Sequence, residues 1–343
     1  MQRKKKKYFV IVTFFAFFMI MAFRNRYMGN DTPGYIALFK KIASFDNPEK
    51  YIESSSVEAG FVWYCWLISR FWGERALFVI TSAFVNFCVG RFVYKYVKYP
   101  GIFCCLFVGL MQFDFFMSAM RQSISVAILL LAFEKIDKNK KISFLFLWYV
   151  AYQFHNSAII FLLIAPFLFK TKSDKKFDNS FGTYMLLFIG VLFVSFFFDK
   201  VFETVLQIFP KYNNYMDSEL SDGEMRLAVI LKVAVFATIF LVPKLYKNGF
   251  ITNIKLYNLG EKLSIINLAM MIIASNATAL MRFVGTFGVY ALMNFSNCFE
   301  KISQDEKKLL LLLTLTCGFI YGLILVVYKT PEWQTTYPIN LAL

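Results

Sequence analysis

Apolar segments separated by short clusters of basic residues run through most of this chain, and they leave few folds open. Hydrophobic residues make up 58% of the sequence, which includes 43 Phe. A backbone inside a bilayer must satisfy its own hydrogen bonds, so such segments predict membrane helices. We expect an all-α polytopic membrane protein with about 10–12 transmembrane or half-spanning helices, re-entrant hairpins and outward-facing loops, forming a single integral membrane domain over residues 1–343. The expected segments are 8–23, 61–72, 76–94, 102–120, 123–136, 142–169, 184–198, 227–242, 263–281, 283–299 and 309–328.

The first apolar segment, residues 8–23, follows the basic run RKKKK at residues 3–7. A secretory signal peptide begins in the same way, but here no small-x-small cleavage site follows. We interpret the segment as a retained first helix. Its basic flank predicts a cytoplasmic N-terminus.

Residues 142–169 form an apolar stretch with a lysine cluster on each side. A continuous helix of that length would be roughly 42 Å long, which exceeds the ~30 Å hydrocarbon core and separates the two clusters across the membrane. A break near residues 153–157 would instead give two half-helices of roughly 20 Å that enter and leave by the same face. The only histidine of the chain, His155, then lies at the tip, where a polar group within the bilayer indicates a site.

Six basic clusters fit one face of the membrane if the apolar segments between them form hairpins. That face is predicted to be cytoplasmic, because Lys and Arg are enriched in cytoplasmic loops. The outside then receives external loops at residues 24–60 and 199–226 and the tail from residue 329, provided that 61–72 is a half-helix or an interfacial helix. Membrane orientation thus explains the net charge of +15 and argues against a nucleic-acid partner. The clusters comprise residues 3–7, 91–98, 135–141, 170–176, 244–262 and 301–308.

The six cysteines lie in apolar segments without C-x-x-C spacing, which indicates neither a disulfide framework nor a zinc site. The chain also has one histidine and no evident cluster of carboxylates. We therefore expect no metal and no cofactor.

Charged residues gather on the predicted outer face. Arg121 and Arg282 each stand between two apolar runs, and an arginine at membrane depth keeps its charge and needs an anion or water. The planar guanidinium can bind two phosphate oxygens, so several arginines at an outer cavity indicate a lipid-linked phosphate or pyrophosphate. The alternative is that each arginine reaches the interface alone or pairs with a carboxylate. The set comprises Arg24, Asp31, Glu58, Arg121, His155, Arg226 and Arg282.

Two functions are open for His155. It could cap backbone groups at the helix break, or it could donate to a phosphate or sugar oxygen and act as a base near neutral pH. The carboxylates Asp31 and Glu58 could accept the proton of a sugar hydroxyl or could be solvated loop residues. Glu58, which precedes the predicted helix at 61–72, is the stronger base candidate.

Four short elements follow one another in the first half of the chain. A D-x-x-x-Y element occupies residues 31–35, and an E-P-G-aromatic element occupies 58–61 with Ala59 in place of the proline. An R-Q-x-I-A-x-A-I element occupies 121–128 with Ser125 in place of an alanine.

The fourth element, A-x-x-F-H-x-S-A, is matched fully by residues 151–158. Together with a late arginine that matches Arg282, the four elements resemble those of the EpsG family of exopolysaccharide polymerases, relatives of Wzy-type polymerases. The motifs cover residues 31–158, and the second half of the chain is similar in layout alone.

This resemblance implies a multi-pass glycosyltransferase in the cytoplasmic (inner) membrane of a bacterium, active at the outer face. Its substrates would be oligosaccharide repeat units on undecaprenyl pyrophosphate, and the growing glycan would be transferred to a new lipid-linked unit, as in exopolysaccharide or O-antigen biosynthesis. Membrane lipid, a chain-length regulator and a flippase are the other partners it implies.

For this reaction we expect Arg121 and Arg282 to bind pyrophosphate, His155 to orient phosphate or acceptor, and Glu58 to act as the base. Arginines could neutralise the leaving group without a metal ion. The remaining expected binding residues are Arg24, Asp31, Gln122 and Arg226.

Three other functions stay open from the sequence. An O-antigen-type ligase would use the same donor and a different acceptor. A flippase or transporter of lipid-linked sugar would be expected to show internal repeats, which are not visible here. A scaffolding protein of an export complex would tolerate substitution of Arg121 and His155.

Overall fold

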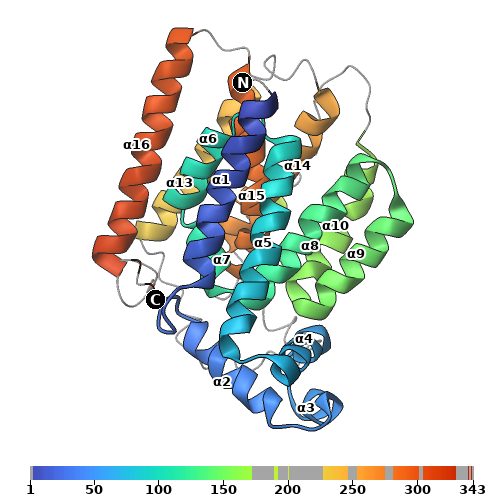
Figure 1. Ribbon diagram of the computed structural model, residues 1–343. Helices are drawn as coiled ribbons and strands as arrows, with labels where there is room; N and C mark the ends of the chain where they lie inside the picture. Colours follow the sequence, from blue (N-terminus) through green and yellow to red (C-terminus); the bar gives the residue numbers. More distant parts are fainter. Residues whose placement is uncertain are drawn as a thin grey trace. The chain divides into compact units, whose positions relative to one another are not determined.

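The computed structural model describes residues 3–171, 189–191, 200, 227–245, 253–274, 281–300, 304–329, 339 and 341. Within these residues the secondary structure is helical apart from one isolated bridge between Arg24 and Leu341 (Figure 1). The predicted all-α polytopic architecture is confirmed. The segment expected at 184–198 lies mostly outside the described residues, as does the loop expected at 199–226.

Among the described residues, two helices and one bent helix pair could cross a membrane by length and composition. Helices α5 (Glu74–Tyr96) and α14 (Ile254–Ile273) are each long and apolar enough to cross a bilayer. Helices α6 (Pro100–Gly109) and α7 (Gln112–Ser118) would make a further span together, but they are bent by 62° at the break between them. Met111 stands at this break with a φ of 58°, which ends the predicted continuous segment at 102–120.

The chain forms two compact units, which we describe separately. The first comprises Met1–Lys170 with Gly322–Leu343, and the second comprises Thr171–Tyr321. A single integral membrane domain over residues 1–343 stays a prediction.

Helices α1 (Arg3–Ala22), α5 and α8 (Met120–Asp137) form the centre of the first unit, with α1 and α8 on either side of α5 (Figure 1). Close packing of α1 against α5 depends on Gly90, since a Cβ there would stand 3.1 Å from the Phe14 ring. Deeper in the unit, Phe92 packs edge-on against Phe133 of α8. Large apolar side chains thus hold these helices together.

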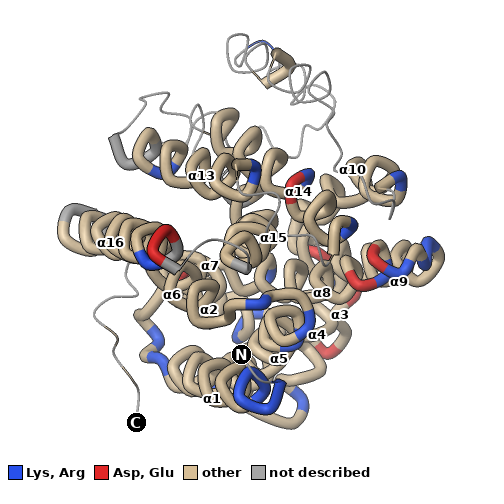
Figure 2. Tube along the Cα trace, turned by 90° about the horizontal axis from the view of Figure 1, so that it is seen from above, with Lys and Arg blue, Asp and Glu red and all other residues tan. Residues whose placement is uncertain are grey.

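One buried carboxylate joins the basic ends of α5 and α8. Glu134 accepts from Arg91 at 3.0 Å, Lys95 at 2.8 Å and Lys138 at 2.9 Å. The predicted clusters at 91–98 and 135–141 therefore lie at the same end of the unit. Figure 2 shows further basic residues at the start of α1, at the start of α9 and directly after α10.

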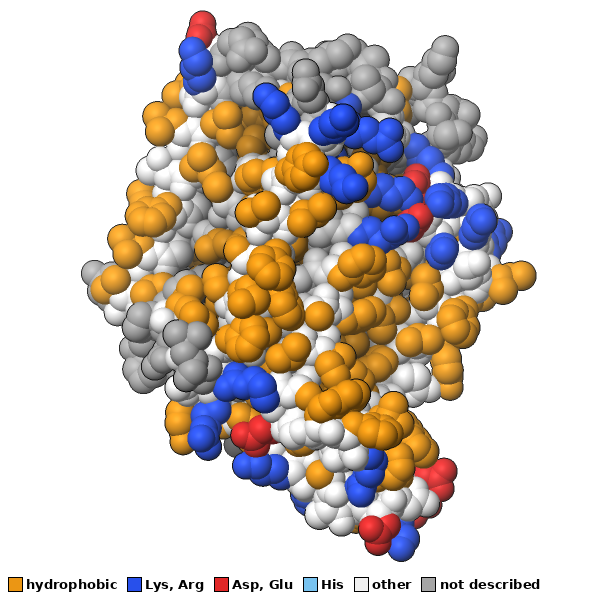
Figure 3. All heavy atoms as spheres, viewed as in Figure 1, with side chains coloured by type: hydrophobic (Ala, Val, Ile, Leu, Met, Phe, Trp, Pro, Cys, Tyr) orange, Lys and Arg blue, Asp and Glu red, His pale blue; other side chains and the backbone are white. Residues whose placement is uncertain are grey.

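A band of exposed apolar side chains lies next to this basic end. Over α1, α5 and α8 to α10, Figure 3 shows hydrophobic side chains with Lys and Arg gathered at their upper edge. Phe15, Phe87 and Phe146 are among the exposed members of the band, at 60%, 66% and 66%. An apolar surface of this kind with a basic border is typical of a protein in a bilayer.

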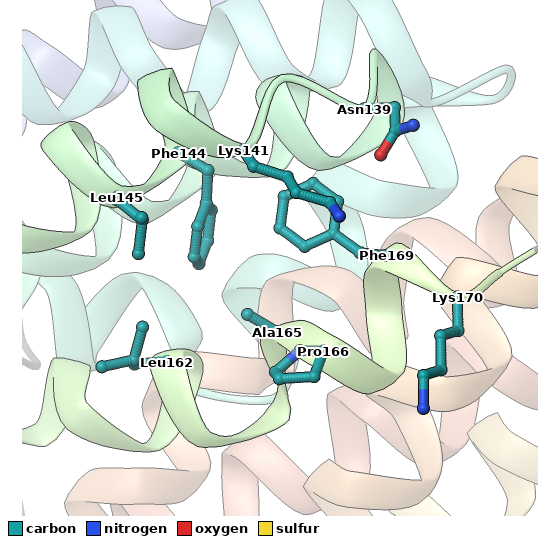
Figure 4. Close-up of a pocket in the computed structure, with 9 residues that line it drawn as sticks. All are labelled: Asn139, Lys141, Phe144, Leu145, Leu162, Ala165, Pro166, Phe169 and Lys170. Atoms are coloured by element: carbon teal, nitrogen blue, oxygen red, sulfur yellow. The ribbon is translucent and has the colours of Figure 1, made fainter.

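The predicted hairpin with a break near residues 153–157 is present, and its re-entry from one membrane face stays a prediction. Helix α9 (Lys141–Phe154) ends at His155, a 3-10 turn (Asn156–Ala158) follows, and α10 (Ile159–Phe169) returns. The start of α9 and the end of α10 line one common cavity, so both lysine-flanked ends lie on the same side (Figure 4). The break also places His155 at the opposite end of the hairpin.

The segment expected as an external loop at 24–60 is largely helical. It contains α2 (Thr32–Ala43) and α3 (Pro48–Ser54), which lie with α4 (Ala59–Phe71) at the lower end of the unit in Figure 1. With 13 residues, α4 would be about 20 Å long and too short to cross a bilayer. It agrees with the half-helix predicted for residues 61–72.

In the second unit, α14 begins at Ile254, well before the predicted start at residue 263. Lys262 is therefore a buried helical residue and not part of a loop cluster, and its ammonium donates to Thr171 at 2.9 Å. Buried Glu261 pairs with Lys244 of α13 (Leu227–Leu245) at 3.2 Å. Because each buried charge has a partner, a charged stretch can belong to an otherwise apolar helix.

Helix α15 (Met281–Asn297) packs against α13 and α14. Helix α16 (Gln304–Lys329) follows along the chain.

Candidate functional site

Arg121 lies in the first turn of α8. Ala119 leaves the helical conformation with φ −89° and ψ 65°, which separates α7 from α8 and makes Arg121 the second residue of the new helix. Backbone N–H groups in a first helical turn have no intrahelical acceptor. The N–H of Arg121 instead points to the hydroxyl of Tyr35 in α2, at 3.5 Å.

Glu58 stands directly before α4 and reaches the Arg121 side chain. Its Oε2 lies 2.6 Å from Arg121 Nη1, and the two side chains are 9% and 22% exposed. The Glu58 carbonyl accepts the first backbone hydrogen bonds of α4, from Phe61 and Val62. The helix thus begins where an E-P-G-aromatic element would start it, although Ala59 replaces the proline.

The tip of the hairpin supplies the second partner of Glu58. The backbone N–H of Asn156 donates to Glu58 Oε1 over 3.1 Å. Gly60 makes this approach possible, because a Cβ at that position would stand 2.6 Å from the Gln153 carbonyl oxygen. One carboxylate therefore connects α4, the start of α8 and the break between α9 and α10.

His155 caps the turn at the hairpin tip. The Ser157 N–H donates to His155 Nδ1 over 3.1 Å, and the Ser157 hydroxyl lies 2.7 Å from the same nitrogen. An Nδ1 that accepts from a backbone N–H places the ring proton on Nε2, as inferred from this network. The capping interpretation and the functional interpretation are compatible, because they use different ring nitrogens.

Tyr35 of the first sequence element lies beside Arg121, and Asp31 of the same element lies near Tyr35. The Tyr35 side chain is buried against Phe61, with 5.8 Å between the ring centres. Burial raises the pKa of Tyr35, and nearby Arg121 opposes that shift while Asp31 adds to it. Asp31 is exposed, so it extends the cluster toward solvent.

Arg24 has other partners. Its guanidinium is 2% exposed and donates to the carbonyls of Met21 at 2.8 Å and Met117 at 3.0 Å, and it lies over the Phe78 ring. Burial lowers the pKa of Arg24 to about 9, with the charge of Arg75 as a second cause. These contacts support a structural contribution, namely fixing the chain after α1 to the end of α7.

Of the remaining expected binding residues, the structure describes the side chain of Gln122 but not those of Arg282 and Arg226. Gln122 is buried inside the first unit at 1% exposure, next to Arg121 in sequence. Arg282 belongs to the first turn of α15 in the second unit, and its side chain lies outside the described part. Arg226 also lies outside the described residues. A pyrophosphate site that combines Arg121 with Arg282 therefore stays a prediction.

The pairing with Glu58 does not use all the N–H donors of Arg121. Glu58 occupies Nη1, whereas Arg121 Nε has no hydrogen-bond partner among the described residues. A guanidinium has five N–H donors, so the pairing with Glu58 leaves donors for a second, bidentate partner. The ion pair holds the guanidinium in one orientation.

Two contributors were not singled out from the sequence. The Tyr35 hydroxyl belongs to the D-x-x-x-Y element, which is the signal that pointed to it. The Asn156 N–H is a backbone group, and no side-chain pattern could have identified it.

One of the three comparisons with known proteins identifies a family. The model of the EpsG family matches residues 7–341 and thus nearly the whole chain. No curated protein matches, and no solved structure matches.

Proposed function

The chain belongs to the EpsG family, a family of Wzy-like polysaccharide polymerases, and on that basis we propose that it polymerises lipid-linked oligosaccharide repeat units. The donor in this proposal is a glycan on undecaprenyl pyrophosphate, and the acceptor is the non-reducing end of a second lipid-linked unit. The single observation that supports the proposed site is the partly buried Arg121–Glu58 pair, which the hairpin tip completes.

Arg121 binds the pyrophosphate in this proposal. When the bond from the glycan C1 to the leaving pyrophosphate oxygen breaks, negative charge grows on the phosphate. A guanidinium already oriented by Glu58 stabilises that charge without reorganisation, which is how preorganised groups lower a barrier. Arg282, Arg226 and Asp31 are further proposed contacts of the donor, and we leave the buried Arg24 and Gln122 out of direct contact.

Glu58 orients Arg121 first and accepts a proton second. Its Oε2 accepts a hydrogen bond from Arg121, and its Oε1 accepts one from the Asn156 N–H. An ionised carboxylate has about four acceptor sites, so Glu58 can also accept a hydrogen bond from the acceptor hydroxyl while it stays paired with Arg121. That hydroxyl loses its proton to Glu58, its oxygen forms the new bond to C1, and undecaprenyl pyrophosphate leaves.

His155 presents Nε2–H to a phosphate or acceptor oxygen, because Nδ1 is used by the turn. This donor lies one residue before the Asn156 N–H that holds Glu58. The proposed reaction needs no metal ion in this form.

The site is proposed to face the outside of the cytoplasmic membrane, with the N-terminus inside. The support is the distribution of charge in the first unit, since the clusters around Glu134 lie at one end and α2 to α4 lie at the other. A flippase would deliver the substrate to this face, and a chain-length regulator would act on the product.

A complementation experiment tests the proposal. A host that lacks the gene receives wild type, Arg121→Ala, His155→Ala or Arg26→Ala at matched membrane levels, and its lipid-linked and surface glycans are separated on a gel. Arg26 is an exposed arginine near α2 and serves as the matched control. We expect a ladder of repeats from wild type and Arg26→Ala, and single repeat units from the other two variants.

Other outcomes favour the alternatives. Full-length polymer that stays on its lipid carrier in the null strain indicates a ligase. Single units that remain on the cytoplasmic side in the null strain indicate a flippase. A normal ladder from Arg121→Ala contradicts the proposed site.

A further inference from the structure

A cavity opens between the two halves of the hairpin, at the end opposite His155. Its volume is about 420 Å³, which lies in the range of small-molecule sites. The wall is apolar and comes from both helices, and the residues at the mouth are polar (Figure 4). The wall includes Phe144, Leu145, Leu162, Ala165 and Phe169, and the mouth includes Asn139, Lys141 and Lys170.

The mouth is positively charged. Lys141 and Lys170 are exposed, and within the described residues neither takes part in an ion pair. Lys138, which directly follows α8 and stands three residues before Lys141, is by contrast paired with Glu134 at 2.9 Å. The N-terminus of α9 and the C-terminus of α10 meet at the mouth, so their dipoles oppose each other and the two lysines supply the positive charge.

An apolar wall with a cationic mouth selects an amphiphile with a negative head. A soluble phosphate would leave the apolar wall unused, and a neutral lipid would gain nothing from the lysines. The lysine end also lies at the basic, predicted cytoplasmic border of the protein, where anionic lipids attract basic residues. We propose that this cavity binds an anionic phospholipid, with an acyl chain between α9 and α10 and the phosphate at Lys141 and Lys170.

Such a lipid would connect the first turn of α9 with the last turn of α10. These ends belong to the hairpin whose tip carries His155 and Asn156, so the bound lipid stabilises the paired half-helices. The inference uses contacts of the cavity alone and does not depend on the proposed polymerase function.

Photo-crosslinking in nanodiscs tests the site. The purified protein is reconstituted in equal parts phosphatidylglycerol and phosphatidylcholine, with a diazirine on the acyl chain of one or the other lipid. Crosslinks on α9 and α10 peptides are then quantified by mass spectrometry. We expect phosphatidylglycerol to label Phe144, Leu162 or Phe169 preferentially.

Three variants sharpen the test. Lys141→Gln/Lys170→Gln should lower the preference for phosphatidylglycerol about 30-fold, at roughly fivefold for each lysine. Lys5→Gln/Lys140→Gln removes the same charge from exposed positions that do not line the cavity, and it should keep the preference. Ala165→Leu narrows the apolar wall of the cavity, leaves the lysines in place and should lower the labelling.

The proposal is overturned if both lipids label equally, which would indicate bulk lipid in an apolar groove. It is also overturned if the control pair lowers the preference as much as the cavity pair, or if Ala165→Leu leaves the labelling unchanged. Gel-filtration profiles of all variants establish that they are folded.

Discussion

Gly60 of α4 lies against Gln153 of α9, and a Cβ at position 60 would stand only 2.6 Å from the Gln153 carbonyl oxygen. This contact brings the residue before α4, Glu58, within reach of the hairpin tip. The glycine of the E-A-G-F element is therefore a spacing requirement of the site.

Gly60→Ala should destabilise the protein by about 1–3 kcal/mol and lower polymer yield, because the backbone of α9 must shift away. Gly34→Ala is the matched control, since a Cβ there has no neighbour within 4 Å and the residue lies in helix α2. Thermal unfolding in detergent and the glycan ladder measure the two effects. Equal unfolding temperatures for the two variants would contradict the proposed close packing.

His155→Asn separates the capping function of the histidine from the proposed chemical one. An Asn side-chain oxygen can accept the Ser157 N–H as Nδ1 does, but it offers no group at the position of Nε2. We expect this variant to fold with wild-type stability and to produce single repeat units. A full ladder from His155→Asn would show that capping is the whole contribution of His155.

The Arg121–Glu58 pair should behave as one unit in a double-mutant cycle. If Glu58 acts mainly by orienting Arg121, then Glu58→Gln, Arg121→Lys and the double variant should lose similar activity, each about 100-fold. Initial rates with purified lipid-linked repeat units measure the coupling. Losses that multiply in the double variant would instead indicate that Glu58 works independently of Arg121.

Ala59→Pro should be tolerated and should raise stability by about 0.4–1 kcal/mol. Position 59 is the first residue of α4, where a missing N–H costs nothing, and Glu58 already has the extended conformation that precedes proline, with φ −62° and ψ 133°. Ala83→Pro, in the interior of α5, is the destabilising comparison. A drop in unfolding temperature for Ala59→Pro would mean that the start of α4 is not as described.

The class of the protein, the first helix, the half-length of α4 and the hairpin with its break at His155 could all be predicted from the sequence. Each follows from the length of an apolar stretch relative to the bilayer and from the positions of basic residues around it. The sequence also selected Glu58, Arg121 and His155, because charged or titratable residues between apolar segments are costly without a purpose.

Which of these groups are in contact could not be predicted from the sequence and is seen in the folded chain. The fold pairs Glu58 with Arg121 and with a backbone N–H, and it turns Arg24 toward main-chain carbonyls. Lys262 lies within a helix, although its charge predicts a loop by hydropathy. Its ammonium donates to the Thr171 hydroxyl, and the neighbouring Glu261 is paired with Lys244, so these charges can be buried. Periodicity and composition describe one segment at a time, whereas these contacts join residues far apart in the chain.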